Sequence, residues 1–242
     1  MSGPRECTPD RARLRHAGEG SGASLEVLLG HYNSTLTSLA VSASGRTLAT
    51  ADRDGRVRIT RLPQAITQGL HEIQAICLGH TEFVTSCAFV RGGSTGAELL
   101  ATGGGDGTLR LWQPSTGALL QTVQLSEGET QAEKTGGEDA KDGSAGAAAA
   151  VLGVAASSSG RYVAAVMDGR DEVFVARVDQ GQEEPAIKAG AWSQLPGLHI
   201  PSQICFDSQD RCEARCGMGG DSASFLCAAS PCFGGWRMAH MG

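Results

Sequence analysis

The chain has 242 residues, with 20 lysines and arginines against 26 aspartates and glutamates, so its formal net charge is −6. Apolar residues make up 40% of the chain and aromatic residues 5%, while 34 residues are glycine. No run of ~18 consecutive apolar residues occurs, which excludes a membrane-spanning helix, and the acidic balance argues against a surface that binds phosphate groups over its whole extent. The composition is typical of a turn-rich β protein that does not act at a membrane.

The first 24 residues are rich in arginine, glycine, serine and glutamate and show no periodic apolar pattern, which predicts a disordered N-terminus over 1–24. From residue 25 onward, short apolar runs alternate with turn residues such as Ser44-Gly45-Arg46. Short strands separated by turns about every 8–12 residues are typical of an all-β sandwich, barrel or propeller.

An internal repeat distinguishes among these architectures. Gly30-His31 is followed by two strand-like segments, Asp54-Gly55 and a third strand, and Gly79-His80 opens the same series again. The second copy closes with Asp106-Gly107 and Trp112. This order is the signature of WD repeats, and it therefore predicts a β-propeller.

Two weaker copies follow the first two. A third copy without its Gly-His runs from 151 to 175, and a fourth begins near 200–206. We therefore expect propeller blades over 25–206, about three to four in number, interrupted by an acidic low-complexity insert at 126–150. The Cys/Gly-rich tail at 207–242 is expected to be disordered.

The repeat predicts a hydrogen-bonded set of polar residues in each blade. His80 is expected to bond Thr102 and Asp106, with Trp112 shielding the set from water, because buried polar groups stabilise a fold only when all of them are paired. In the first copy we assign the corresponding structural roles to His31 and Asp54.

The sequence predicts no catalytic, cofactor-binding or metal-binding residues. The glycine-rich 103–107 segment lacks the Lys-Ser/Thr of a phosphate-binding loop, and no nucleophile accompanies Asp52 and Asp54. Cys212-x3-Cys216 and Cys227-x4-Cys232 leave a zinc-binding tail open as an alternative, although structural zinc sites favour tighter spacings.

Basic side chains follow the first repeat's turn. Strand alternation places Arg56 and Arg58 on one face, and Arg53 projects from the turn beside the exposed aromatic Phe83. Such a face is often merely solvated, but arginine and aromatic side chains on a rigid surface are typical of protein-binding sites.

Three segments are more specific than a generic WD repeat: Thr50-Ala51-Asp52-Arg53-Asp54, Cys77-Leu78-Gly79-His80-Thr81-Glu82-Phe83-Val84, and 105–112. Together they resemble the WD-repeat non-catalytic subunit of the eukaryotic tRNA (guanine-N7) methyltransferase. The resemblance is firm from Gly30 to Leu125 and thins from 151 to 206.

The resemblance implies a scaffold rather than an enzyme. A seven-bladed propeller in that family forms a heterodimer with a catalytic subunit, which binds S-adenosylmethionine and modifies tRNA, so the chain would be an incomplete propeller that meets tRNA mainly through this partner. It implies a nuclear location, with the cytoplasm as a second one. The partner-binding residues that it implies are Asp52, Arg53, Arg58, Thr81, Glu82 and Phe83. A WD-repeat adaptor of a ubiquitin ligase or a chromatin assembly is the alternative.

Overall fold

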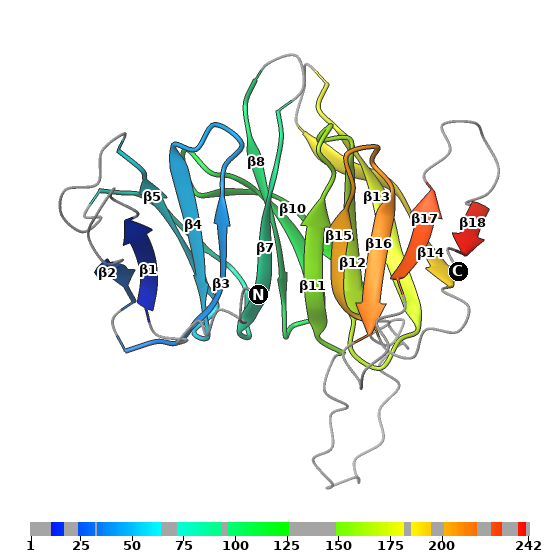
Figure 1. The fold of residues 1–242 in the computed structure, drawn as a ribbon, viewed down its shortest axis with the longest axis horizontal. Coiled ribbons are helices and arrows are strands. Elements are labelled where there is room, and N and C mark those ends of the chain that lie inside the picture. Colours follow the sequence, from blue (N-terminus) through cyan, green and yellow to red (C-terminus); the bar gives the residue numbers. More distant parts are fainter. Residues whose placement is uncertain are drawn as a thin grey trace, which may run out of the picture.

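A computed structural model describes residues 11–16, 24–31, 33–63, 72–92, 96–125, 149–181, 185–194, 201–216, 224–228 and 237–240. All regular secondary structure in these residues is β-strand, and they include no helix long and apolar enough to cross a membrane. The strands form one two-stranded sheet and four four-stranded sheets (Figure 1). The all-β prediction is therefore confirmed.

Four sheets follow one another along the chain, each an antiparallel meander. We call them the first to fourth blades. The first contains β3 (Leu36–Val41), β4 (Thr47–Asp52), β5 (Arg56–Arg61) and β6 (Ile73–Leu78). The second contains β7 (Val84–Val90), β8 (Leu99–Gly104), β9 (Thr108–Gln113) and β10 (Ala118–Gln124). The third contains β11 (Val151–Ala156), β12 (Tyr162–Met167), β13 (Glu172–Asp179) and β14 (Ala186–Gln194). The fourth contains β15 (Pro201–Phe206), β16 (Cys212–Cys216), β17 (Ser224–Ala228) and β18 (Arg237–His240).

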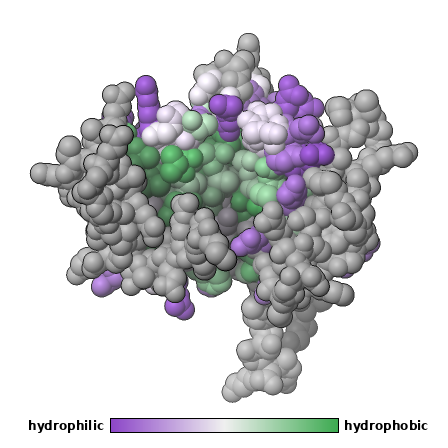
Figure 2. All heavy atoms as spheres, in the orientation of Figure 1, coloured by the Kyte–Doolittle hydropathy of each residue, from purple (hydrophilic) through white to green (hydrophobic). Residues whose placement is uncertain are grey.

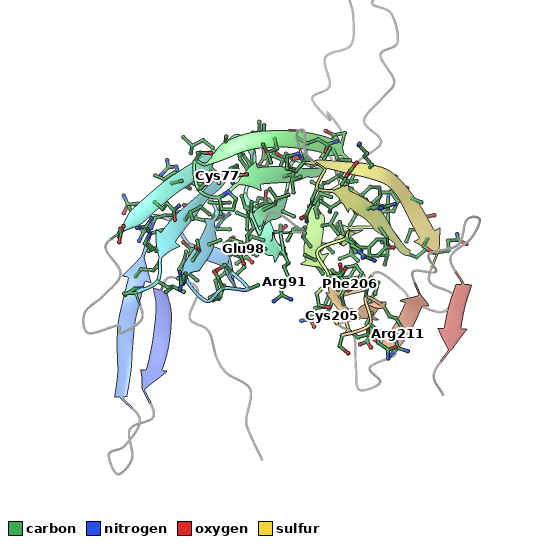
Figure 3. All side chains as sticks on the ribbon, turned by 90° about the horizontal axis from the view of Figure 1, so that it is seen from above. Cys77, Arg91, Glu98, Cys205, Phe206 and Arg211 are labelled. Carbon is green, nitrogen blue, oxygen red and sulfur yellow. The ribbon has the colours of Figure 1, made fainter. Side chains whose placement is uncertain are left out.

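The blades stand side by side in an open arc, as the view from above shows (Figure 3). The first strands of the blades, β3, β7, β11 and β15, lie next to one another on the concave side of the arc. An open arc of four blades agrees with the predicted incomplete propeller.

Apolar residues between neighbouring blades form the core. Strand alternation turns Val57 and Ile59 toward the second blade, where they pack with Leu100 and Trp112. A second cluster joins the second and third blades, and a third cluster joins the third and fourth. Because burying one such side chain stabilises a fold by about 1.5–3 kcal/mol, each blade depends mainly on its neighbours.

The structure differs from the sequence prediction at both ends. β1 (Arg11–His16) lies within the segment that we expected to be disordered, and it pairs antiparallel with β2 (Ser24–Gly30). In the same way β16, β17 and β18 extend the fourth blade into the predicted disordered tail. The ladder supplies backbone hydrogen bonds that a polar, glycine-rich sequence does not reveal. Most of the acidic insert, 126–148, lies outside the described residues.

Candidate partner-binding rim

In the second blade, a histidine bridges a carboxylate and a threonine. His80 Nδ1 lies 2.9 Å from Asp106 Oδ2, and its Nε2 lies 2.8 Å from Thr102 Oγ1. An ionised carboxylate only accepts, so Nδ1–H donates to Asp106 and the Thr102 hydroxyl donates to Nε2. Trp112 Nε1 donates to the same hydroxyl oxygen at 2.8 Å, and the indole is almost completely buried. The structure thus places His80, Thr102, Asp106 and Trp112 in one network.

Asp106 is the ionised centre of this network. Burial by itself would raise the pKa of its carboxyl group, but hydrogen bonds from His80 and Thr108 outweigh burial and hold the pKa well below its usual range. The Thr81 amide also donates to Asp106 Oδ2 at 3.2 Å. The carboxylate therefore fixes both the turn that enters the blade and the turn between β8 and β9.

In the first blade, the corresponding acid is Asp52, which corrects the assignment of Asp54. His31 Nδ1 lies 2.8 Å from Asp52 Oδ2, and its Nε2 lies 2.7 Å from Thr50 Oγ1. Asp52 Oδ1 accepts from the amides of Asp54 and Arg56, both at 3.0 Å. Asp52 is 2% exposed, whereas Asp54 is an exposed turn residue.

The two blades form the same histidine network, but their aspartates occupy positions of the repeat that differ by two residues. Asp52 aligns with Gly104, where an added Cβ would lie 2.7 Å from His80 Nδ1 and 3.0 Å from Asp106 Oδ1. The second blade therefore needs glycine at 104 and takes its carboxylate from the turn, while the first takes it from the end of the strand. The sequence signal for this difference is that Asp52 of the first repeat aligns with Gly104 of the second.

The turns of the first two blades are locked together at one rim. Gly55 has a φ of +78°, and an added Cβ would lie 2.9 Å from the carbonyl oxygens of His80 and Glu82. Only glycine combines this conformation with such a close approach. The β4–β5 turn therefore packs directly on the β6–β7 turn, a contact that the sequence analysis did not identify.

Phe83 is held on this rim by the turn between β8 and β9. The Gly105 amide donates to the Phe83 carbonyl oxygen at 2.8 Å, and a Cβ on Gly105 would lie 2.7 Å from the Phe83 ring. The ring is thus stacked on a glycine backbone and remains 38% exposed. Arg53, Thr81 and Glu82 are exposed beside it. We call Arg53, Thr81, Glu82 and Phe83 the partner rim.

Two of the predicted partner-binding residues lie elsewhere. Asp52 is buried and its carboxylate is occupied, so it supports the rim but presents no side chain to a partner. Arg58 lies on the face of the first blade opposite Val57 and Ile59, and its Nη1 donates to the Gly30 carbonyl oxygen at 3.3 Å. Partial burial lowers the pKa of Arg58 from its usual value.

The described residues contain no group of three or more histidine, cysteine, aspartate or glutamate side chains that could hold a metal ion. Of the cysteines in the alternative zinc-binding tail, Cys212 is buried against the third blade, Cys216 and Cys227 lie on neighbouring strands, and Cys232 lies outside the described residues. Burial raises the pKa of Cys77 to about 12 and that of Cys87 to about 11, so these thiols stay protonated in the interface between the first two blades.

The fold and the histidine networks define a WD-repeat β-propeller, and a solved structure agrees. The β-propeller domain of Cps50 (Swd1) from Myceliophteria thermophila superposes with a TM-score of 0.55 at 17% sequence identity, covering 85% of this chain and 59% of that one. The family described as the tRNA methyltransferase TRM82 WD40 domain matches residues 10–205. The chain belongs to this family.

Curated relatives carry corresponding names. The tRNA (guanine-N(7)-)-methyltransferase non-catalytic subunit wdr4 of Danio rerio is 32% identical over 186 residues, which are 77% of this chain and 40% of that protein. Its Homo sapiens counterpart, WDR4, is 41% identical over 98 residues, 40% of this chain and 22% of that protein. The chain therefore spans well under half the length of these relatives.

Proposed function

We propose that the chain is a non-catalytic scaffold subunit that binds the catalytic subunit of a tRNA (guanine-N7) methyltransferase as a heterodimer and stabilises its active shape. The partner rim carries the proposal. Its exposed side chains stand on two turns that pack on each other without any intervening side chain at Gly55. A surface that is already ordered pays little conformational entropy on binding, so it can impose its shape on a partner.

The chemistry of the rim suits a protein partner. Phe83 offers an aromatic anchor, and Arg53 and Glu82 offer opposite charges that would fix the register of the complex. Arg58 would extend this surface along the outward face of the first blade. In this proposal the catalytic subunit alone binds S-adenosylmethionine, the complex modifies tRNA in the nucleus, and this chain contributes no catalytic group.

Co-purification tests the proposal. The full chain is co-expressed with its cognate catalytic subunit, treated with nuclease so that RNA cannot bridge the two proteins, and recovered through a tag on the catalytic subunit. We expect a one-to-one complex whose affinity falls at least about tenfold when Arg53→Glu and Phe83→Ala are combined, because both residues are rim anchors. Arg177→Glu, at an exposed position of the third blade, is the matched charge-reversal control.

Two results would overturn the proposal. Recovery of no complex would reject the methyltransferase partner and favour a WD-repeat adaptor for another assembly. A complex that the rim variant weakens no more than the Arg177→Glu control would reject the partner rim as the binding surface.

A further inference from the structure

The edge of the arc opposite the partner rim carries the turn between the first two strands of each blade. In an antiparallel meander the β3–β4 and β4–β5 turns lie at opposite edges of the sheet. The β3–β4, β7–β8, β11–β12 and β15–β16 turns accordingly lie along the upper edge of Figure 1. The hydropathy view shows hydrophilic residues along this edge, above an apolar concave surface (Figure 2).

Arginine recurs at one position of these turns. Arg46, Arg161 and Arg211 each follow a residue with a positive φ, namely Gly45 at +69°, Gly160 at +72° and Asp210 at +60°. In the second blade, Arg91 directly follows β7 and projects toward the concave side (Figure 3). We call Arg46, Arg91, Arg161 and Arg211 the arginine rim.

Hydrogen bonds join each of these turns to the next. The Ser44 amide and hydroxyl donate to the Glu98 carboxylate at 3.2 and 3.3 Å, which links the first and second blades. Gln180 Nε2 donates to the carbonyl oxygens of Arg91 and Gly160 at 2.7 and 2.9 Å, which links the second and third.

Asp210, in the β15–β16 turn of the fourth blade, joins the third and fourth blades. The Ser158 hydroxyl and the Ser159 amide both donate to Asp210 Oδ1 at 3.2 Å. The four turns are thus tied pairwise, and the spacing of the arginines is set by the rigid blades beneath them rather than by flexible loops.

Most of the positive charge on this rim is unneutralised. Arg46, Arg91 and Arg161 are exposed, and none of them forms an ion pair with a described residue. Arg211 Nε donates to Asp207 Oδ2 at 2.5 Å. The other two acids of these turns, Glu98 and Asp210, already accept hydrogen bonds from the neighbouring turn.

The acidic excess of the chain is attached at the opposite edge. The insert 126–150 contains six acidic residues against two lysines. β10 ends at Gln124 and β11 begins at Val151, both at the edge of the partner rim. The edge with the arginine rim also carries Glu72 and Asp179, but these acids pair with Arg61 and Lys188 and do not neutralise the rim arginines.

We propose that the arginine rim binds the phosphate backbone of an RNA. Guanidinium groups form paired hydrogen bonds with phosphate oxygens, and such contacts are independent of base sequence. The choice of RNA rests on the proposed function, since the relatives are named for an enzyme that acts on tRNA. The rim would hold one end of the tRNA while the partner rim holds the catalytic subunit.

The salt dependence of tRNA binding by the full chain, without the catalytic subunit, tests this proposal. Fluorescence anisotropy with a labelled tRNA transcript is recorded between about 50 and 200 mM salt. The double variant Arg46→Gln, Arg161→Gln should reduce the slope of log K against log salt by about 1.5, because each phosphate contact contributes about 0.7–0.9. Neither side chain forms a hydrogen bond or an ion pair with a described residue, so both variants should fold normally.

Arg56→Gln removes one charge from an exposed position at the opposite edge, where β5 begins, and should leave the slope unchanged, whereas Arg46→Gln alone should reduce it by about 0.7–0.9. Equal slope changes in these two single variants would overturn the proposal, as would tRNA binding without salt dependence. Binding to phosphatidylserine vesicles but not to tRNA would also reject it. If the arginine variants change the slope but the chain forms no complex with the catalytic subunit, only the methyltransferase partner is rejected. If the complex forms but the slope does not change, only the arginine rim is rejected.

Discussion

Each of the first two blades is fastened at one edge by a histidine that joins a carboxylate to a threonine hydroxyl. Hydrogen bonds to a charged group contribute about 1.5–3 kcal/mol each, roughly twice as much as neutral ones. Removing one partner leaves the others buried without a hydrogen bond, so the networks should respond strongly to conservative changes. The two aspartates near the first turn allow a direct comparison.

Asp52→Asn should lower the free energy of unfolding by about 1.5–3 kcal/mol, because the amide loses the charge that three donors share. Asp54→Asn should change it by less than about 0.5 kcal/mol, since Asp54 is exposed. Urea titrations followed by tryptophan fluorescence measure both. Equal effects of the two substitutions would contradict the assignment of Asp52 to the network.

The ionised state of Asp106 predicts an acid-sensitive contribution to stability. Its pKa is held below the ordinary value of 3.8, so in acid the unfolded chain takes up the proton first. The stabilisation is fully present above about pH 4 and is lost as the pH falls from there toward the folded-state pKa. Compared with Asp106→Asn, the wild-type protein should lose stability more steeply below about pH 4 in denaturant titrations. Parallel pH profiles would contradict this.

At the scale of the strands and turns, glycine controls how closely neighbouring blades approach. Gly55 and Gly45 occupy similar left-handed turns of the first blade, with φ values of +78° and +69°. They differ in their surroundings, because a Cβ would meet two carbonyl oxygens at Gly55 and nothing within 4 Å at Gly45. The pair therefore separates backbone strain from contact between blades.

Gly45→Ala should cost about 1 kcal/mol of stability through its left-handed backbone alone. Gly55→Ala should cost about 1–2 kcal/mol more, because the β4–β5 turn must also move away from the β6–β7 turn. Thermal denaturation compares the two, and binding of the catalytic subunit should weaken only in Gly55→Ala. Identical losses of stability would show that the contact at Gly55 is unimportant.

The strands of the first two blades followed from sequence because turn residues and alternation repeat in register. The sequence did not show that Asp52, rather than Asp54, belongs to the histidine network of the first blade, because an aspartate at either position fits the same repeat. Only the space around Gly104 distinguishes the two positions. The motifs singled out the exposed residues of the partner rim, whose role in binding stays a prediction, but the contact of Gly55 with the His80 and Glu82 carbonyls depends on how two blades pack. The start of the fourth blade was expected near 200–206, where β15 lies, but β16, β17 and β18 were missed because these short strands lie in a Cys/Gly-rich segment with little alternation.

At the scale of the whole molecule, four blades in an arc present two edges of different chemistry. One edge carries the partner rim, and the other carries the arginine rim. Each blade is stabilised chiefly by its neighbours, so damage to one interface spreads to the adjoining turns. The arrangement suits a subunit that holds two other molecules in a fixed relation.

The most direct test of the scaffold proposal is the rate of methyl transfer to guanine N7 of tRNA by the catalytic subunit, measured alone and with the full chain. The proposal predicts that the wild-type chain raises the rate at least about tenfold, and that Arg53→Glu combined with Phe83→Ala abolishes this gain. A rate that is the same with and without the chain would contradict the proposal.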